Sequence, residues 1–403
     1  MSVFLSKYPN ADRLYPSANM DSLGSTNELL VQMGLVYQVS SGFIMLSPLL
    51  QMIQDRLEDA AKAESLKHGF QPLGLPFIMP PDLLKDSGKY EEYQREFYHS
   101  EVEGKNYLFA PTTEEAVVSY LKEGGLKSYK QLPMRFYHPH HVFRHIERPE
   151  GIFKSRDFKA ILLSSFDQNI EGFRVSMKVF SDICDVLFTK WGIETLSLSG
   201  KNGEIIEHLF ECDIGDRPLN KGVIANRGFS AEQIATEVSN ETKLANISMG
   251  YEFDRVSRLG LRFADNTGSL KYPIMGTFCI GIQRCLYALL QKARNGATSA
   301  FNSSVRPFDL VILPIGDCSS GLHEKVRALS ETLESDGIRV AIDDRNSQLS
   351  KKFSLADFFS IPVRIPISTK DIQNDDIQIR QSGGRSQNVP YQNLVSAIHA
   401  TLN

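Results

Sequence analysis

The chain has 403 residues, of which 42% are hydrophobic and 23% charged, and its formal net charge is −4. This composition is typical of a globular protein with two or three domains, and it argues against a chain that holds nucleic acid by bulk positive charge. No apolar run approaches the roughly 18 to 20 residues that cross a bilayer, so we expect no membrane insertion. The five cysteines form no CxxC pair, which favours reduced thiols in an intracellular protein.

The first long predicted element is a helix. Apolar residues recur with helical spacing at Leu50, Ile53, Leu57 and Ala61, and Gly69 ends the pattern. The next residues, FQPLGLPFIMPPDLL, are typical of an extended segment interrupted by prolines. A long helix followed by a proline-ended strand is therefore the first predicted unit.

The centre of the chain predicts a long-looped antiparallel hairpin. One strand, MRFYHPHHVFRHI, is expected to run up to Ile146, and the other, SRDFKAILLSSF, is expected to start at Ser155. The polar, turn-forming residues ERPEGIFK connect them. Beyond the hairpin, a helix is expected to end at Gly192, and a weaker helix is expected over residues 230–242.

Two further patterns organise the C-terminal part. A short strand is expected to run into a helix that stops at Gly296, and the small polar residues after it are a good linker. From residue 307 onward, strand and helix patterns alternate. This alternation predicts a compact α/β domain with a mostly parallel sheet.

Three histidines in the first hairpin strand raise the question of a metal site. Two of the side chains of His138, His140 and His141 fall on one strand face, but zinc normally takes three or four ligands, and no carboxylate or thiolate is placed beside them by spacing. Half-exposed strand histidines without a metal are the favoured interpretation, so no zinc is expected. Neither a Rossmann nor a P-loop glycine pattern is present.

The ends of the predicted elements carry arginines within segments that have a wider resemblance. Arg144 precedes the hairpin loop, Arg156 follows it, and Arg284 starts the later helix. The surrounding segments PDLLKDSGKYEEY, PTTEE…SYKQLP, VFRHIERPEGIFKSRDF and IMGTFCIGIQR resemble the ordered landmarks of class II aminoacyl-tRNA synthetases. The most similar type is the bacterial and organellar prolyl-tRNA synthetase.

The resemblance implies a class II catalytic domain, which is an α+β domain with an antiparallel sheet and flanking helices, followed by an α/β anticodon-binding domain. The implied parts are an N-terminal lead over 1–28, the catalytic domain over 29–296, a linker over 297–306 and the anticodon-binding domain over 307–403. The three implied class II motifs are motif 1 near 50–84, motif 2 over 136–166 and motif 3 over 272–294. The large editing insertion of many bacterial members has no room here.

The resemblance also implies a catalytic site for ATP. Arg144 matches the arginine that binds the ATP α-phosphate and the amino-acid carboxylate, and Arg284 matches the arginine set against the γ-phosphate. Such groups suit the reaction because carboxylate attack on phosphorus brings anions together, and a preset guanidinium supplies paired donors. The remaining implied ATP-binding residues are Arg156, Glu147 and Glu207.

Thr112 and Glu114 match the element that lines the proline pocket, with Glu114 facing the substrate's ammonium and Arg144 its carboxylate. The residues expected to contact tRNA are Arg148 and Lys154 in the motif 2 loop and Asp344 and Arg345 in the C-terminal domain.

The sequence departs from the family pattern at several of these places. Family members typically continue Phe-Arg with an acidic pair, whereas this chain has His145 and Ile146. Glu147 would take the role only by a one-residue shift, which in a strand reverses the face. The second motif 2 strand lacks a charged and aromatic run over 161–166. Cys279 replaces a family glycine and Tyr251 a family histidine.

The resemblance and the departures from it imply two alternative functions. The first is a proline–tRNA ligase that uses ATP with Mg²⁺, proline and tRNA(Pro), and acts as a homodimer. The alternative is a paralogue that has lost or changed aminoacylation and serves as a tRNA-binding or regulatory subunit. The N-terminal residues are at best a weak organellar signal. Because mitochondrial relatives normally lack the editing insertion, the resemblance implies the mitochondrial matrix in a eukaryote and otherwise the cytoplasm.

Overall fold

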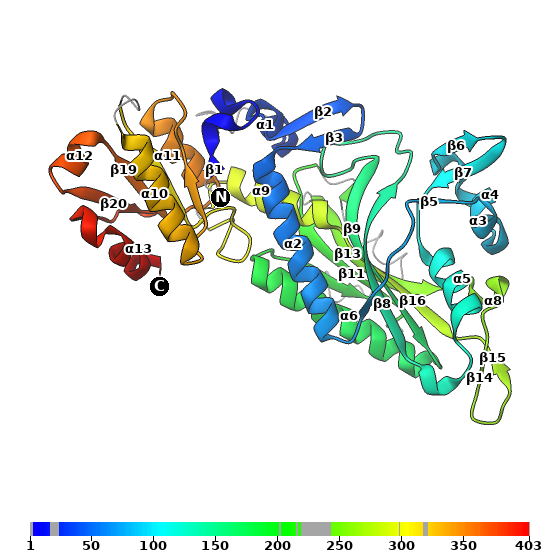
Figure 1. The fold of residues 1–403 in the computed structure, drawn as a ribbon. Coiled ribbons are helices and arrows are strands. Elements are labelled where there is room, and N and C mark those ends of the chain that lie inside the picture. The colour runs from blue at the N-terminus through cyan, green and yellow to red at the C-terminus, as the bar shows by residue number, and fades with distance from the viewer. Residues whose placement is uncertain are drawn as a thin grey trace. The chain divides into compact units, whose positions relative to one another are not determined.

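The structure is a computed structural model that describes residues 3–16, 24–200, 203–214, 217–218, 243–297, 299–316 and 321–402. The chain divides into two compact units (Figure 1). One unit consists of Gln38–Ile44 and Leu57–Ala288, and the other of Met1–Tyr37, Met45–Arg56 and Leu289–Asn403. The helix expected over 230–242 lies outside the described residues. Among the residues that are described, no helix is long and apolar enough to cross a membrane.

The first unit is built on a large sheet with the strand order β10-β11-β13-β16-β9-β8-β4, and β12 pairs with β13. All of these pairs are antiparallel except β4 with β8. The bounds are β4 Gln71–Pro72, β8 Met134–Phe143, β9 Asp157–Asp167, β10 Leu196–Ser199, β11 Ile205–Glu211, β12 Arg217–Pro218, β13 Lys243–Phe253 and β16 Ile274–Ile280. The predicted hairpin is confirmed as β8 and β9, and the sheet is largely antiparallel with a flanking helix, as expected.

The hairpin strands are shorter at the loop than predicted, because β8 ends at Phe143 rather than at Ile146. The backbone N–H of Arg144 still donates to the carbonyl of Arg156, at 2.9 Å. The next N–H, that of His145, instead donates to the carbonyl of Glu96, at 2.7 Å, so the chain leaves the ladder there.

Helix α6 (Ile170–Trp191) packs against one face of this sheet, which we call the covered face. The side chain of Asn169 caps its start by accepting from the N–H of Gly172, and Gly192 ends it in the left-handed region at φ 71°, as predicted. The ring of Phe180 on α6 stacks on Phe278 of β16, with ring centres 4.8 Å apart. A Cβ atom at Gly250 would lie 2.6 Å from the Phe278 ring, so the glycine makes room for this contact.

Smaller elements complete the first unit. A three-stranded sheet joins β5 Ile78–Met79, β7 Lys105–Phe109 and β6 His99–Val102, and a two-stranded sheet joins β14 Phe263–Ala264 and β15 Leu270–Lys271. Four short helices pack together beside them, namely α3 Asp82–Ser87, α4 Lys89–Tyr93, α5 Glu114–Gly124 and α8 Val256–Leu259.

The predicted strand-to-helix transition and the first long helix are both confirmed. Helix α9 (Ile282–Arg294) follows β16 after Gly281, and α2 (Pro48–Lys67) buries its Leu50, Ile53, Leu57 and Ala61 completely. Before α2 the chain forms α1 Thr26–Gln32, β2 Val36–Ser40 and β3 Phe43–Leu46.

The second unit contains a six-stranded sheet with the order β1-β18-β17-β19-β20-β21. The first three pairs are parallel and the last two antiparallel, which agrees with the predicted α/β domain. Its strands are β1 Val3–Phe4, β17 Leu310–Pro314, β18 Val340–Ile342, β19 Val363–Ile367, β20 Ile377–Gln381 and β21 Ser386–Val389, and its helices are α10 Leu322–Ser335, α11 Leu349–Phe358, α12 Thr369–Gln373 and α13 Leu394–Leu402. Strand β1, from the expected N-terminal lead, is an edge strand of this sheet.

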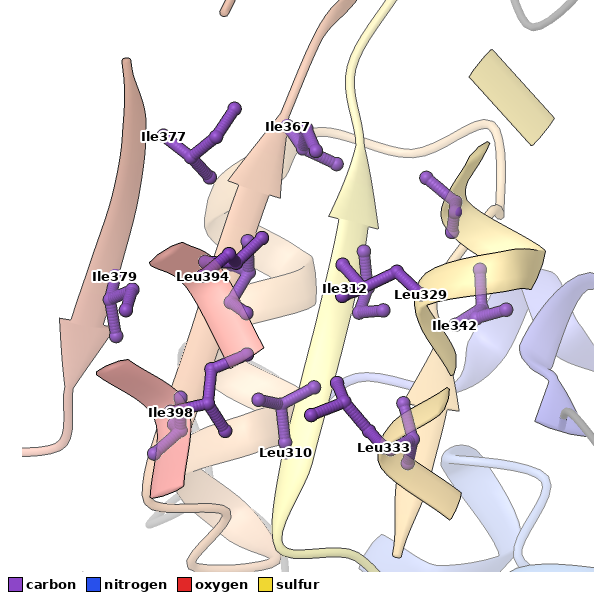
Figure 2. Packing of buried hydrophobic residues seen from close by; sticks show 14 of the residues in the cluster. Leu310, Ile312, Leu329, Leu333, Ile342, Ile367, Ile377, Ile379, Leu394 and Ile398 are labelled. Carbon is purple, nitrogen blue, oxygen red and sulfur yellow. The ribbon is translucent and has the colours of Figure 1, made fainter. Parts of the chain in front are cut away.

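The core of this sheet is almost entirely aliphatic (Figure 2). Leu310 and Ile312 of β17 pack with Leu333 of α10 and Ile398 of α13. Every residue of β17 is buried, because helices cover both faces of a mostly parallel sheet. The apolar runs that identified these strands in the sequence are explained by this two-sided burial.

Candidate active site

The open face of the large sheet, opposite the covered face, carries the polar groups of the candidate site. Along β16, the side chains of Thr277 and Cys279 point to the open face, while Phe278 points to the covered face. The strand register places further residues on the open face in one row with Cys279, and these are His138, Leu162, Met249 and Glu207. The row runs across β8, β9, β16, β13 and β11, so predicted site residues from distant segments share this surface.

The charges of both predicted catalytic arginines affect Cys279, the central residue of this row. Arg144 and Arg284 each lower the pKa of the Cys279 thiol, although burial, the largest effect, raises it to about 11. Arg144 also lowers the pKa of the Glu114 carboxyl. The charges of Arg144, Arg284 and Glu114 therefore all act on Cys279.

Arg144 directly follows β8 and is exposed. Its Nε donates to the carbonyl of Pro111, at 3.0 Å, and its guanidinium carbon lies 5.9 Å from the ring centre of Phe158. Because one edge of the guanidinium is anchored by Pro111, the terminal nitrogens are oriented by the protein and remain accessible to an anion.

Arg284 lies in the first turn of α9. Its Nη1 donates to the carbonyl of Asn246, at 2.6 Å, and its guanidinium carbon lies 5.1 Å from the ring centre of Phe153. The start of a helix favours negative charge, so the position suits a phosphate group.

Phe153 was missed by the sequence reasoning. The residue lies in the loop between β8 and β9 but is buried, and its ring centre is 5.3 Å from that of Tyr287 on α9. The Tyr287 hydroxyl donates to Asp213 Oδ1, at 2.5 Å. The sequence did contain a signal for this burial, because Ile152 and Phe153 form an apolar pair inside an otherwise polar loop. Such a pair indicates that the loop folds back onto motif 3.

Glu114 begins α5 and is buried. Its Oε1 accepts from the Thr277 hydroxyl, at 3.1 Å, and its Oε2 accepts from the N–H of Thr113, at 3.1 Å, and from Lys89 Nζ, at 3.4 Å. Burial alone would raise the pKa of this carboxyl, but Lys89, the backbone N–H, Thr277 and Arg144 together lower it to about 2. Glu114 is therefore a fixed negative charge at the site.

Lys89 was also missed by the sequence reasoning. Its Nζ donates to the Thr112 hydroxyl, at 3.2 Å, and lies within ion-pair distance of both Glu114 and Glu115. Thus the two predicted proline-binding residues, Thr112 and Glu114, are held by one lysine. The lysine stands in the matching segment SGKYEEY, but its distance to the glutamates could not be obtained from spacing.

Arg156, Glu147 and Glu207 complete the predicted nucleotide-binding set. Arg156 lies opposite Arg144, and its side chain donates to the carbonyls of Ile146 and Ser41. Glu207 is buried on the open face, whereas Glu147 is exposed in the loop. Since β8 ends before Glu147, the argument that a one-residue shift reverses the strand face does not apply there.

The departures from the family pattern fall in three different environments. His145 is exposed and its ring lies edge-on to Tyr98, while Ile146 contributes its carbonyl to Arg156. Tyr251 lies directly opposite Thr277, and burial raises the pKa of its hydroxyl. In the run 161–166, Leu162, Ser164 and Phe166 belong to the open face, and the residues between them belong to the covered face.

The expectation that the hairpin histidines are half-exposed was wrong for His138 and His140, which are buried, and holds for His141. His138 Nε2 is 2.8 Å from the Thr113 hydroxyl, and the ring of His140 stacks on Phe77, with centres 5.2 Å apart. Desolvation lowers the pKa of His138 to about 3 and that of His140 to about 4. In the described part of the chain, no group of three or more His, Cys, Asp or Glu side chains could hold a metal ion.

The predicted tRNA-contacting residues differ in accessibility. Arg148 is exposed and Lys154 is half-buried in the motif 2 loop. Asp344 accepts from the backbone N–H and the hydroxyl of Ser6. Arg345 is buried, with its Nε and Nη2 bound to Asp343 at 2.7 and 2.6 Å. A contact between Arg345 and tRNA would require this pairing to open.

Comparison with known proteins gives these features a family. Residues 97–293 match the class II tRNA synthetase core domain of the G, H, P, S and T type, and residues 309–401 match an anticodon-binding domain. Together the two ranges span well over half of the chain. The chain belongs to the class II aminoacyl-tRNA synthetases and carries an anticodon-binding domain, as the sequence motifs predicted.

Similar curated proteins and solved structures within this class include enzymes named for proline. A proline–tRNA ligase of Pelagibacter ubique is 25% identical, with 89% of this chain and 90% of that protein covered, and one of Anaplasma phagocytophilum is 25% identical, with 90% and 92% covered. The fold is similar to that of a prolyl-tRNA synthetase from Cryptosporidium parvum, with a TM-score of 0.74, 14% identity and coverage of 96% and 79%. The Giardia lamblia prolyl-tRNA synthetase, solved with prolyl-adenylate, gives a TM-score of 0.69 with 17% identity and coverage of 90% and 72%.

Proposed function

We propose that the chain is a proline–tRNA ligase. Proline and ATP would give prolyl-adenylate and pyrophosphate, and a hydroxyl of the terminal ribose of tRNA(Pro) would then attack the adenylate and release AMP. The observation that carries this proposal is the arrangement around the open face: Glu114 accepts from Thr277 on β16, Arg144 follows β8, and Arg284 starts the helix that follows β16. The proline–tRNA ligases among the relatives support the choice of amino acid.

The two arginines would divide the charge of the nucleotide. Arg144, held at Pro111, would bind the α-phosphate and the proline carboxylate, and so bring the two anions into the geometry of attack. Arg284 would bind the γ-phosphate at the start of α9. ATP enters such a site with Mg²⁺, and the buried carboxylate of Glu207, together with Glu147 and Arg156, would complete the nucleotide site.

The proline pocket would lie at the start of α5. The carboxylate of Glu114 stays ionised and would accept both hydrogens of the secondary ammonium, with Thr112 beside it. A pocket for the proline ring discriminates only modestly between substrates of similar size. We expect the contact between Glu114 and the ammonium to orient proline, and not to provide the whole selectivity.

The remaining assignments extend this proposal to partners. Arg148 and Lys154 would approach the tRNA acceptor end, and Asp344 and Arg345 would belong to the surface that reads the anticodon. We also propose a homodimer through motif 1. The expected compartment remains the mitochondrial matrix in a eukaryote and otherwise the cytoplasm.

A paralogue without aminoacylation is the second candidate. Two observations favour it: the acidic pair of motif 2 is replaced by His145 and Ile146, and Phe153 of the motif 2 loop covers the Arg284 guanidinium. In that case the anticodon-binding domain would keep a role in tRNA binding.

Proline-dependent exchange between ATP and pyrophosphate tests the proposal. The wild-type protein should exchange, and Arg144→Ala or Arg284→Ala should each lower the rate by about 10²-fold or more, because each removes a preorganised donor to developing charge. Arg262→Ala is the matched control, since this exposed arginine contacts Tyr272, by stacking on its ring and by a hydrogen bond of 2.6 Å to its hydroxyl, and touches none of the proposed site residues. Absence of exchange by the folded wild-type protein at saturating proline would contradict the ligase, and retained tRNA binding would then support the paralogue.

A further inference from the structure

Behind the predicted proline pocket lies a cluster of one cation and two adjacent carboxylates. Lys89 Nζ is 3.4 Å from Glu114 Oε2 and 3.6 Å from Glu115 Oε1. The Glu115 Oε1 also accepts from the Ser87 hydroxyl, at 2.9 Å. The same lysine donates to Thr112, so the cluster connects the pocket surface with the interior.

The cluster is shielded from water. The side chains of Lys89, Glu114 and Glu115 retain 15%, 11% and 1% of their exposure. Glu115 Oε2 is buried and has no hydrogen-bond partner among the described residues. A buried carboxylate without a full set of partners is strongly disfavoured in its charged form.

No second cation compensates Glu115 among the described groups that face it. Arg255, which directly precedes α8, and Arg258 on α8 both donate to the carbonyl of Ser87, and Arg255 is also paired with Glu92. From β13 the nearby titratable group is the Tyr251 hydroxyl, which is neutral at physiological pH, and burial raises its pKa further. Arg144 acts on Glu114 from the pocket side.

With only one cation for two carboxyls, the pKa values of Glu114 and Glu115 shift in opposite directions. Burial and then the neighbouring charge of Glu114 raise the pKa of Glu115, against the effect of Lys89 and Ser87, whereas the pKa of Glu114 is lowered. Without a substrate, a proton on Glu115 leaves one cation and one anion in the cluster. With the substrate's ammonium at Glu114, two cations are balanced only if Glu115 is ionised.

We propose that Lys89 and Glu115 are positioning residues of the amino-acid pocket, and that Glu115 releases its proton to solvent when a substrate ammonium binds Glu114. Lys89 then shifts its ion pair from Glu114 toward Glu115, which frees Glu114 for the substrate. No bond other than the Glu115 O–H is broken. This inference rests on the proposed function, because it takes Glu114 as the group that receives the ammonium.

Calorimetry measures the released proton directly. Proline is titrated into the wild-type protein at several pH values between about 5.5 and 7.5, in buffers with low and high ionisation enthalpy. We expect the heat to depend on the buffer with a slope that corresponds to proton release and grows toward low pH. Glu115→Gln should abolish that slope, and Asp86→Asn, an exposed acid on α3, should leave it unchanged. Equal slopes for the wild type and Glu115→Gln, or no release at any pH, would overturn the proposal.

Exchange kinetics supply a second readout. Glu115→Gln should raise the KM for proline about tenfold and leave kcat within about twofold, since it removes binding energy but no reacting group. Lys89→Met should raise KM further, Lys89→Arg should restore most of the affinity, and Lys85→Met is the matched lysine control on α3. If the wild type exchanges but Glu115→Gln and Lys89→Met keep its KM, this inference fails alone. If the wild type does not exchange, the proposed function fails. Proton release on titration with proline then still tests whether Glu115 loses its proton when the ligand binds.

Discussion

The two faces of the large sheet use the same strands for different purposes. On β16, Phe278 packs into the covered face, between Phe180 of α6 and Phe70, while its neighbours Thr277 and Cys279 lie on the open face. Side chains alternate along a strand, so one sequence serves both faces at every second residue. On this strand a large ring fixes the sheet on one side, and the smaller Thr277 and Cys279 leave space for ligands on the other.

The difference between the two faces shows that burial of apolar side chains stabilises the fold, whereas burial of polar side chains sets their charge. On the covered face, burial of apolar area is favourable without further conditions. On the open face, the buried polar groups each need a partner, and the pairing of Glu114 with Thr277 and Lys89 sets its charge. In the sheet of the second unit every residue of β17 is buried, so that strand has no face left for polar site residues.

The largest effect should come from the covered face. Phe278→Ala should lower the free energy of unfolding by about 3–5 kcal/mol, because the cavity lies between fully buried rings. Urea unfolding measures the loss. Tyr120→Ala on the exposed side of α5 is the control and should change stability by less than about 0.5 kcal/mol. A similar small effect of Phe278→Ala would remove the distinction between the faces.

An intermediate effect is expected from the buried histidines of β8. In the folded protein desolvation lowers the pKa of His138 to about 3 and of His140 to about 4, so the unfolded chain binds more protons below pH 6.5. Stability should therefore fall with pH from about 6.5 toward 4, by up to about 1.4 kcal/mol per pH unit for each histidine.

Urea unfolding between pH 7 and 4.5 checks this slope. The double variant His138→Gln, His140→Gln should make the slope shallower, and the rest should come from His208 of β11, because burial lowers its pKa to about 4 as well. His145→Gln, at an exposed position, should leave the slope unchanged. An unchanged slope in the double variant would show that other groups cause the acid sensitivity.

The smallest effect should come from a single thiol on the open face. Cys279→Ser should change stability by less than about 1 kcal/mol, because the half-buried side chain can reach water. Cys285→Ser, the matched change at a fully buried thiol of α9, should lose about 1–3 kcal/mol, because its hydroxyl is desolvated. Equal losses would mean that Cys279 on the open face is packed as tightly as the fully buried Cys285.

Local patterns predicted the elements well. The 3.6-residue spacing of Leu50, Ile53, Leu57 and Ala61 identified α2, and the turn-rich residues between two apolar strands identified the hairpin of β8 and β9. The strand end at Phe143 was missed, because the N–H of His145 is captured by Glu96, about fifty residues earlier in the chain. A long-range hydrogen bond has no local sequence signal.

The sequence by itself determined the class of fold, the order of the motifs and the candidate residues Arg144, Arg284, Thr112 and Glu114, because residue type and spacing encode secondary structure and matching motifs. Only the tertiary structure decided which groups meet: Phe153 on Arg284, β1 beside β18, and Lys89 between two glutamates. The physical reason is that charge and burial depend on distances in space, to which residues far apart in the sequence contribute equally.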